Sequence, residues 1–253
     1  MLPACIASVR RQTDPHWEHI IVDDGSSDGT PDVARCAAEG DLRVRIIETG
    51  GVGRGRALNR GLQEAAGAVV TILDSDDLTH PQRVEVIRAL SDELKGYGVI
   101  TGRKNLLFGS GGPPVWETVV GSMPRVVDIT RSIRYGNPIS HSGAFSRRDF
   151  LCWLGGYDET RSAQFDFDLW IRIVEAGYRL GSVDLALDCK RIHARQSFER
   201  RSRLRYLGSS AKLQIRAIRL FSRPRILAYL YLPLRLLRSL LARPLKNLLV
   251  ARR

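Results

Sequence analysis

The sequence has few cysteines, no long apolar run and no export signal. Its four cysteines stand far apart among 253 residues, with no CxxC pair, which excludes the usual spacing of a zinc site and of a disulfide framework. No stretch approaches the roughly 20 consecutive apolar residues that span a bilayer. The first residues, MLPACIASVRRQT, lack the basic start and apolar run of a signal peptide. These absences predict a cytoplasmic protein with reduced cysteines.

Acidic residues are absent from the last part of the chain. Residues 200–253 hold 15 of the 39 lysines and arginines and no aspartate or glutamate, which leaves 24 basic and 27 acidic residues in 1–199. The net charge of +12 therefore comes from the tail. The 43% hydrophobic content is typical of a globular protein with a proper core. We divide the chain into a globular body, residues 1–198, and a basic tail, residues 199–253.

The body alternates strand-like and helix-like segments. HIIVDD at 19–24 and VRIIE at 44–48 are β-branched runs, and the TPDVARCAAEG between them has a threonine cap, a proline at the first helical position and a glycine stop. A helix-like segment at 56–66 precedes the strand-like AVVTIL at 68–73. This alternation predicts an α/β fold with a mostly parallel sheet flanked by helices. Ligands bind at the carboxyl ends of the strands in such sheets.

Aspartates follow two of the predicted strands. They are Asp23 and Asp24 after the first, and Asp74, Asp76 and Asp77 after the third. Carboxylates this close repel one another unless a cation lies between them, and their hard oxygens suit Mg²⁺ or Mn²⁺ shared with substrate phosphates. The alternative is that Asp77 or Thr79 caps the next helix. The second acidic loop, DDGSSDGT, is built of turn formers that let the backbone approach a ligand, which favours the binding site.

Three segments of the body form an ordered series of motifs. They are SVRRQTDPHWEHIIVDDGSSDGT, GRALNRGLQEAAGAVVTILDSDD and GGYDETRSAQFDFDLWIRIVEAGYRLG. The series, over about residues 7–198, resembles family 2 glycosyltransferases, inverting enzymes with the GT-A fold. The resemblance implies a Rossmann-like GT-A domain with a donor half, about 1–102, and an acceptor half, about 103–198. It implies transfer of a sugar from a UDP-, dTDP- or GDP-sugar to a saccharide or lipid-linked acceptor, in synthesis of a cell-surface polysaccharide or glycolipid.

The resemblance also assigns roles to residues of the donor half. In the DDGS loop, the second aspartate contacts the base of the nucleotide. The DxD motif and the aspartate after it contact the ribose and hold a divalent metal, Mn²⁺ or Mg²⁺. A basic residue of the glycine-rich loop TGGVGRG meets the donor. The residues implied are Asp23, Asp24, Arg54, Arg56, Asp74 and Asp76 for donor binding, and Asp76, Asp77 and His193 for the metal.

In the acceptor half, Asp166 matches the catalytic carboxylate of the family. The resemblance implies that Asp166 takes the proton of the acceptor hydroxyl while the metal stabilises the leaving diphosphate. From the residues alone, Asp166 and Asp168 equally suit the first turn of a helix, where they favour its dipole. GNPISHSGAFSRRDF resembles the family segment that lines the acceptor side, with His141 in a structural role. His193 matches a late family histidine, although a lone histidine is usually structural.

The family's first strand, which ends in a Pro-x-Tyr-Asn turn, has no counterpart in this sequence. The chain starts inside the following helix, with Leu2, Ile6 and Val9 at helical spacing. Because that strand is central in the family's sheet, its neighbours should have unpaired edges and the base pocket should be incomplete. Two interpretations stay open: a sequence that begins after its true start, which the intact carboxylates favour, or a degenerate, non-catalytic relative that binds sugar nucleotides.

The tail has the pattern of a basic amphipathic helix. At about 100° per residue, its basic side chains gather in one sector and its leucines lie opposite. The basic set is Arg235, Arg238, Arg243 and Lys246, and the leucines are Leu236, Leu237, Leu240, Leu241 and Leu248. This pattern predicts peripheral contact with the inner face of the plasma membrane. The alternative is a solvated or packed helical extension. Because few aromatics alternate with the arginines, we expect no nucleic-acid partner.

Overall fold

The computed structural model describes most of the body and two segments of the tail. The described residues are 1–103, 105–108, 114–119, 121, 123–192, 203–221 and 226–236. The predicted metal ligand His193 and the basic residues Arg238, Arg243 and Lys246 lie outside them.

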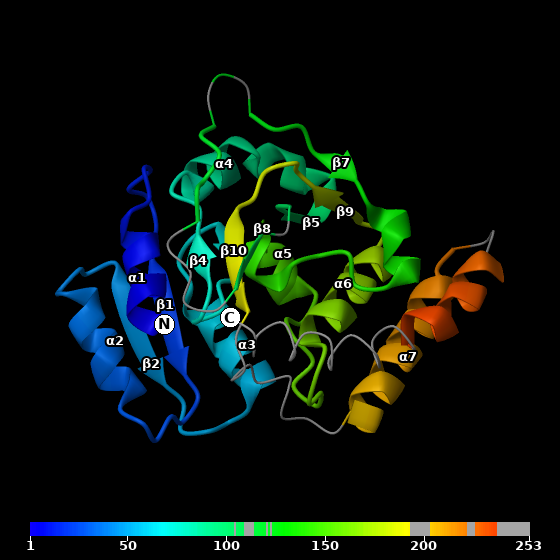
Figure 1. Ribbon diagram of the computed structural model, residues 1–253, viewed down its shortest axis with the longest axis horizontal. Helices are drawn as coiled ribbons and strands as arrows, with labels where there is room; N and C mark the ends of the chain where they lie inside the picture. The colour runs from blue at the N-terminus through cyan, green and yellow to red at the C-terminus, as the bar shows by residue number, and fades with distance from the viewer. Residues whose placement is uncertain are drawn as a thin grey trace.

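Helices and strands alternate through the body as the sequence predicts (Figure 1). The strands are β1 (His19–Asp23), β2 (Val44–Glu48), β3 (Val69–Thr71), β4 (Leu78–Thr79), β5 (Tyr97–Thr101), β6 (Leu106–Phe108), β7 (Val127–Asp128), β8 (Ala144–Arg147), β9 (Arg179–Ser182) and β10 (Asp188–Ile192). The helices are α1 (Leu2–Arg10), α2 (Thr30–Ala38), α3 (Arg54–Glu64), α4 (Arg83–Ala89), α5 (Arg148–Trp153), α6 (Phe165–Glu175) and α7 (Arg203–Arg219). Short 3₁₀ helices are η1 (Ser91–Lys95), η2 (Thr130–Tyr135) and η3 (His141–Gly143), and residues 226–236 are helical.

The described strands form three sheets, in the orders β1-β2, β4-β10-β6 and β3-β8-β5-β9-β7. The α/β prediction is confirmed, but the sheets are mixed rather than mostly parallel. The pairs β1-β2, β10-β6 and β5-β9 are parallel, whereas β10-β4, β3-β8, β5-β8 and β7-β9 are antiparallel. Strand β8 lies between β3 and β5 and runs antiparallel to both.

Strands β1 and β3 are both edge strands of their described sheets. Within the described residues, β1 pairs only with β2, and β3 pairs only with β8. The helix expected at the beginning of the chain forms as α1, with Cys5 and Ile6 buried. Each of these two strands therefore keeps one edge that no described strand covers.

The five-stranded sheet has an apolar layer on each face. Successive residues of β5 alternate between the layers: Val99 packs with the helices α5, α6 and α7, and Ile100 packs with α4 and η1. The first layer contains Trp170, which is 2% exposed. Trp170 is therefore a core residue and not a platform for a sugar.

The described part of the tail lies against the body. Helix α7 packs on α6 and on η2, and Figure 1 shows α6 and α7 on the side of the molecule opposite α1 and α2. Among the described residues, no helix has the length and hydropathy needed to cross a membrane.

Candidate active site

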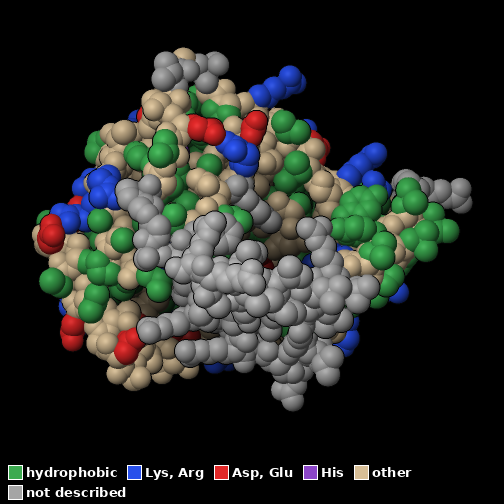
Figure 2. All heavy atoms as spheres, viewed as in Figure 1, with side chains coloured by type: hydrophobic (Ala, Val, Ile, Leu, Met, Phe, Trp, Pro, Cys, Tyr) green, Lys and Arg blue, Asp and Glu red, His purple; other side chains and the backbone are tan. Residues whose placement is uncertain are grey.

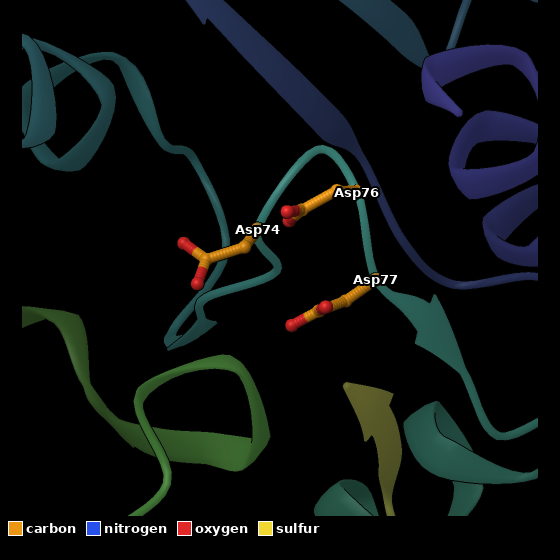
Figure 3. A group of neighbouring side chains, drawn as sticks. All are labelled: Asp74, Asp76 and Asp77. Atoms are coloured by element: carbon orange, nitrogen blue, oxygen red, sulfur yellow. The ribbon is translucent and has the colours of Figure 1, made fainter. Parts of the chain in front are cut away.

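Three aspartates cluster in the loop that joins β3 to β4. Asp74, Asp76 and Asp77 each present a carboxylate oxygen, and these oxygens lie within 4.8 Å of one another. Figure 3 shows the side chains of Asp76 and Asp77 projecting from the loop in the same direction. The loop follows the carboxyl end of β3, where the sequence predicts the site. Carboxylate oxygens at this spacing fit a hard divalent cation.

Residues of the acceptor half hold the aspartate loop in place. The hydroxyl of Ser142 donates to Oδ2 of Asp77 at 2.6 Å and accepts the N–H of Asp74 at 3.0 Å. The N–H of Arg191 in β10 donates to Oδ1 of Asp77 at 2.9 Å. The alternative that Asp77 or Thr79 caps the next helix is wrong, because Thr79 belongs to β4 and α4 begins at Arg83 with Gln82 as its N-cap.

The carboxylates of this loop differ in acidity. Burial raises the pKa of Asp77 to about 6, and the charge of Asp74 adds to the effect. Burial also opposes the ionisation of Asp74, but Arg54, His141 and Lys190 outweigh it and lower the pKa of that group. The carboxyl group of Asp77 is therefore fully buried without enough nearby positive charge to stabilise its ionised form. A divalent cation among the three aspartates would supply that charge, so the residues present fit a metal.

Two cations approach Asp74 from different elements. Nη2 of Arg54, at the start of α3, lies 2.8 Å from Oδ1 of Asp74, and Nζ of Lys190 in β10 lies 3.8 Å from Oδ2. Of the two arginines predicted to meet the donor, the structure brings Arg54 to the aspartate cluster. Arg56 instead pairs with Glu159, with 3.3 Å between Nε and Oε2.

The two aspartates after β1 have different partners. Asp23 is 7% exposed and accepts the N–H groups of Gly25 and Ser26, so its carboxylate closes the turn. Asp24 accepts the N–H of Gly53 at 3.0 Å and the hydroxyl of Thr49 at 2.8 Å. Asp24 thereby joins the DDGS loop to the glycine-rich loop.

The backbones of these two loops are in close contact. Gly25 has φ +86°, and a Cβ built on it would lie 2.9 Å from the backbone nitrogen of Gly51. Only glycine leaves room for this approach, which explains the glycine at position 25. Both predicted donor-binding aspartates therefore connect the two loops. The side chain of Asp24 accepts from Thr49 and Gly53, and the backbone carbonyl of Asp23 accepts the N–H of Thr49 at 2.9 Å.

Asp166 opens helix α6, where the sequence places the base. Nδ2 of Asn137 donates to Oδ2 of Asp166 at 2.6 Å. The other amide atom of Asn137, Oδ1, accepts the N–H of Ile139 at 3.1 Å. Because Oδ1 is engaged by a backbone donor, the amide must present its N–H to Asp166. Asn137 thus acts as a pure donor toward this carboxylate.

Asp168, two residues along the same helix, has a different role. Its side chain is 4% exposed and pairs with three arginines: Arg172 at 2.9 Å, Arg216 at 3.0 Å and Arg161 at 3.6 Å. Both aspartates lie in the first turn of α6, as the dipole interpretation requires. The helix dipole alone does not account for either aspartate, because Asn137 bonds to Asp166 and three arginines pair with Asp168.

A half-buried histidine and a buried tyrosine lie near the two acidic sites. Nε2 of His141 and the hydroxyl of Tyr157 are 3.0 Å apart, and the two rings meet edge to face. Burial lowers the pKa of His141, while the charges of Asp166 and Asp74 act against that shift. His141 therefore lies within electrostatic reach of both the aspartate cluster and the carboxylate of α6.

Four residues that contact the acidic groups were missed by sequence reasoning: Asn137, Ser142, Lys190 and Arg191. Two of them, Asn137 and Ser142, belong to GNPISHSG, a segment of the acceptor half in which several polar residues occur together. That polarity is a signal that could have found them. Lys190 had no such signal, because the pairing of β10 with β4 brings it to the loop.

Comparison with known families identifies the chain. The family model described as glycosyl transferase family 2 matches residues 1–151. EpsE of Bacillus subtilis (strain 168), named as a candidate glycosyltransferase, is 30% identical over 250 residues, which cover 97% of this chain and 87% of EpsE. The chain therefore belongs to glycosyltransferase family 2, and it is a glycosyltransferase by class.

Solved structures confirm the GT-A fold. S. aureus TarS, residues 1–349 in complex with UDP-GlcNAc, superposes with a TM-score of 0.65 at 18% identity, covering 91% of this chain and 66% of that one. The mannosyltransferase PcManGT from Pyrobaculum calidifontis, in complex with GDP-Man and Mn²⁺, gives 0.64 at 23% identity, covering 90% and 64%. The chain thus spans slightly under two thirds of each of these structures.

Proposed function

We propose that the protein transfers a sugar, with inversion, from a nucleotide-diphosphate sugar to an acceptor hydroxyl, and that a divalent metal at the aspartate cluster assists. The observation that carries this proposal is the pair of acidic sites described above. One is a three-aspartate loop that fits a cation, and the other is a single carboxylate, Asp166, held by an amide donor. A metal site and a separate carboxylate are the two parts that inverting transfer requires.

Each side of the site has a separable task. Asp76 and Asp77 would hold the metal, which when bound supplies positive charge to the leaving diphosphate. Arg54 and Lys190 lie beside Asp74, where they can contact donor phosphates. On the acceptor side, Oδ2 of Asp166 accepts from Asn137, so Oδ1 is the atom we assign to take the proton of the acceptor hydroxyl.

We propose a role in making a cell-surface polysaccharide or glycolipid, with a saccharide or lipid-linked acceptor at the inner face of the plasma membrane. One supporting relative is TuaG of Bacillus subtilis (strain 168), named as a candidate teichuronic acid biosynthesis glycosyltransferase. It is 40% identical over 83 residues, which cover 32% of each chain. The complexes of structural neighbours with UDP-GlcNAc and with GDP-Man and Mn²⁺ support a nucleotide-sugar donor and Mn²⁺ or Mg²⁺ as the metal.

A second candidate function is non-catalytic binding of sugar nucleotides. The observation in its favour is that, among the described strands, only β2 pairs with β1, because the DDGS loop that would meet the nucleotide base follows directly from β1. The intact pair of acidic sites favours the enzyme.

Calorimetric titration of UDP, dTDP and GDP, with and without Mn²⁺, tests the proposal. We expect one nucleotide to bind, and its affinity to depend on the metal. Donor hydrolysis or transfer by the same preparation would separate the enzyme from the binding relative. Failure of all three nucleotides to bind in the presence of Mn²⁺ would contradict both functions.

A further inference from the structure

The helix at 226–236 leaves one apolar face uncovered. Its exposed side chains include Ile226 (67%), Leu227 (56%), Leu230 (63%) and Leu234 (64%). At about 100° per residue, these four fall within a sector of about 100°, so they form one continuous strip. We call these four residues the apolar strip. Figure 2 shows hydrophobic side chains gathered at this edge of the molecule, with basic side chains beside them.

The opposite side of the same helix is fixed to the body. Ala228 is fully buried, and the ring of Tyr231 meets Tyr135 of η2 edge to face, with centroids 5.6 Å apart. Nη1 of Arg235 donates to Oε1 of Gln214 in α7. These contacts set the rotation of the helix, so the apolar strip faces outward because the other side is occupied.

Arg235 corrects one expectation from the sequence. The helical wheel placed it in a basic sector facing the membrane, but its guanidinium points into the body, where burial lowers its pKa. A Cβ built on Gly136 would lie 2.8 Å from Nε of Arg235. The wheel was misleading because a long arginine side chain can reach a buried acceptor that the sequence does not reveal.

The chemistry of the segment selects an anionic bilayer as the occupant of the strip. Residues 200–253 carry 15 basic and no acidic side chains, so the segment that contains the strip has no acidic group to repel an anionic surface. Tyr229 and Tyr231, which are 38% and 37% exposed, flank the strip and suit the headgroup level of a membrane. The helix is too short to span, so its apolar face fits an interfacial position.

The docked helix would also place the acceptor side of the active site near the bilayer. Arg235 lies against Gly136, and the next residue, Asn137, donates to Asp166. The body segment that supports the helix is therefore continuous with the residue that holds the base.

We propose that the apolar strip docks the protein on an anionic bilayer, and that this orientation presents the Asp166 side of the active site to a lipid-linked acceptor. The inference deepens the proposed function and rests on it for the acceptor. The docking itself is independent of nucleotide binding, which makes the two separately testable.

Vesicle sedimentation tests the docking surface. The full chain is mixed with vesicles of phosphatidylglycerol and phosphatidylcholine in equal parts, and with vesicles of phosphatidylcholine alone. We expect binding to the anionic vesicles, and a loss of roughly tenfold or more in the partition coefficient of the double variant Leu230→Gln/Leu234→Gln. The matched control is Leu42→Gln, whose side chain is 94% exposed in the loop between α2 and β2. Equal partition of all three proteins would overturn the proposal.

A second measurement separates the bilayer from a second copy of the chain. Sedimentation velocity of the parent and of Leu230→Gln/Leu234→Gln, without vesicles, gives their oligomeric states. A parent dimer that becomes a monomer in the variant, with unchanged vesicle binding, would assign the strip to self-association and overturn the proposal. Binding of UDP, dTDP or GDP with Mn²⁺ should be the same in both proteins, and failure of both proteins to bind any of the three would instead count against the proposed function.

Hydrogen exchange tests the orientation. On anionic vesicles we expect slower exchange at 226–236 and at 130–137, relative to the free protein, with no change in α2. Protection of 226–236 without protection of 130–137 would overturn the claim that the acceptor side faces the bilayer. Brominated lipids give a site-specific check, because they should quench Leu230→Trp more strongly than Leu42→Trp.

Discussion

Asn137 and Asp166 are joined by a 2.6 Å hydrogen bond whose direction is fixed by a third group, the N–H of Ile139. If the Asn137 amide rotated by 180°, its NH₂ group would face the N–H of Ile139, and two donors would meet. Asp166 therefore always receives an N–H at Oδ2. One carboxylate oxygen is thereby held, and the other is left for chemistry. The first two predictions below depend on this arrangement.

Asp166→Asn should remove transfer while leaving donor binding intact. The amide cannot accept a proton from the acceptor hydroxyl, so we expect turnover to fall by roughly 100- to 10,000-fold. Transfer is measured with the donor identified by calorimetry, and nucleotide affinity with Mn²⁺ is measured on the same protein. Retained turnover would remove Asp166 as the base.

Asn137→Asp should lower turnover more than Asn137→Ala does. The aspartate can still accept the N–H of Ile139, so the local turn is kept, but it places a carboxylate against Oδ2 of Asp166 where an N–H donor was. A purely structural role of Asn137 predicts the opposite order, because alanine loses both bonds. The kcat values and the pH profile of kcat decide between them, with nucleotide affinity as the control for folding.

Asp77→Ala should abolish metal-dependent nucleotide binding. In the parent, a proton competes with the metal for Asp77, whose pKa is raised by burial to about 6. Affinity for Mn²⁺ should therefore be steady above about pH 7 and fall as the pH drops through 6, because the ligand must be deprotonated. Calorimetry across this range measures it. The control is Asp184→Ala, which removes an exposed carboxylate paired with Arg103. Unchanged metal affinity in Asp77→Ala would contradict a metal site at the aspartate cluster.

Lys190→Met should weaken nucleotide-diphosphate binding by about tenfold, the size of one charge-assisted contact. Methionine keeps most of the apolar length of the side chain and removes the charge that lies 3.8 Å from Asp74. Titration of inorganic pyrophosphate tests whether the lost contact is to phosphate. Lys95→Met, on the exposed η1 helix, is the matched control. An equal loss for a nucleoside without phosphates would argue against the assignment.

Asp168→Asn should destabilise the fold. Asp168 is almost fully buried, and its charge offsets those of Arg161, Arg172 and Arg216. Removing the charge leaves three partly exposed arginines without their buried partner, which costs about 2 kcal/mol of the free energy of unfolding. Urea denaturation measures this, with Asp149→Asn on the exposed Arg147 pair as the control. A loss as small as that of the control would mean that the arginines find other partners.

The sequence was sufficient for the class of fold and for the position of the acidic groups. The alternation of strands and helices and the aspartates at strand ends are local patterns, which can be read directly from neighbouring residues in the sequence. The directions of β4, β7 and β8 were not predictable, because a residue pattern marks a strand but not the neighbour it pairs with or its direction in the sheet.

The residues that complete the site come from distant parts of the chain, which sequence patterns do not bring together. Ser142 and Arg191 hold a loop that lies more than 60 residues away in sequence. Arg54 and Arg56 are indistinguishable as sequence candidates, but on α3 they diverge, one toward Asp74 and one toward Glu159. Arg235 likewise satisfies the helical wheel and yet faces inward.

The position of Arg216 determines where the chain can be truncated without damage to its interior. A version that ends at residue 198 would remove Arg216, and with it one countercharge of Asp168 and the 2.5 Å ion pair with Glu175. Its loss of activity would then report a damaged interior, whatever the tail does at a membrane. A version that ends at residue 221 keeps α7 and its ion pairs and removes the apolar strip. Truncation therefore separates catalysis from docking only when the cut falls after α7.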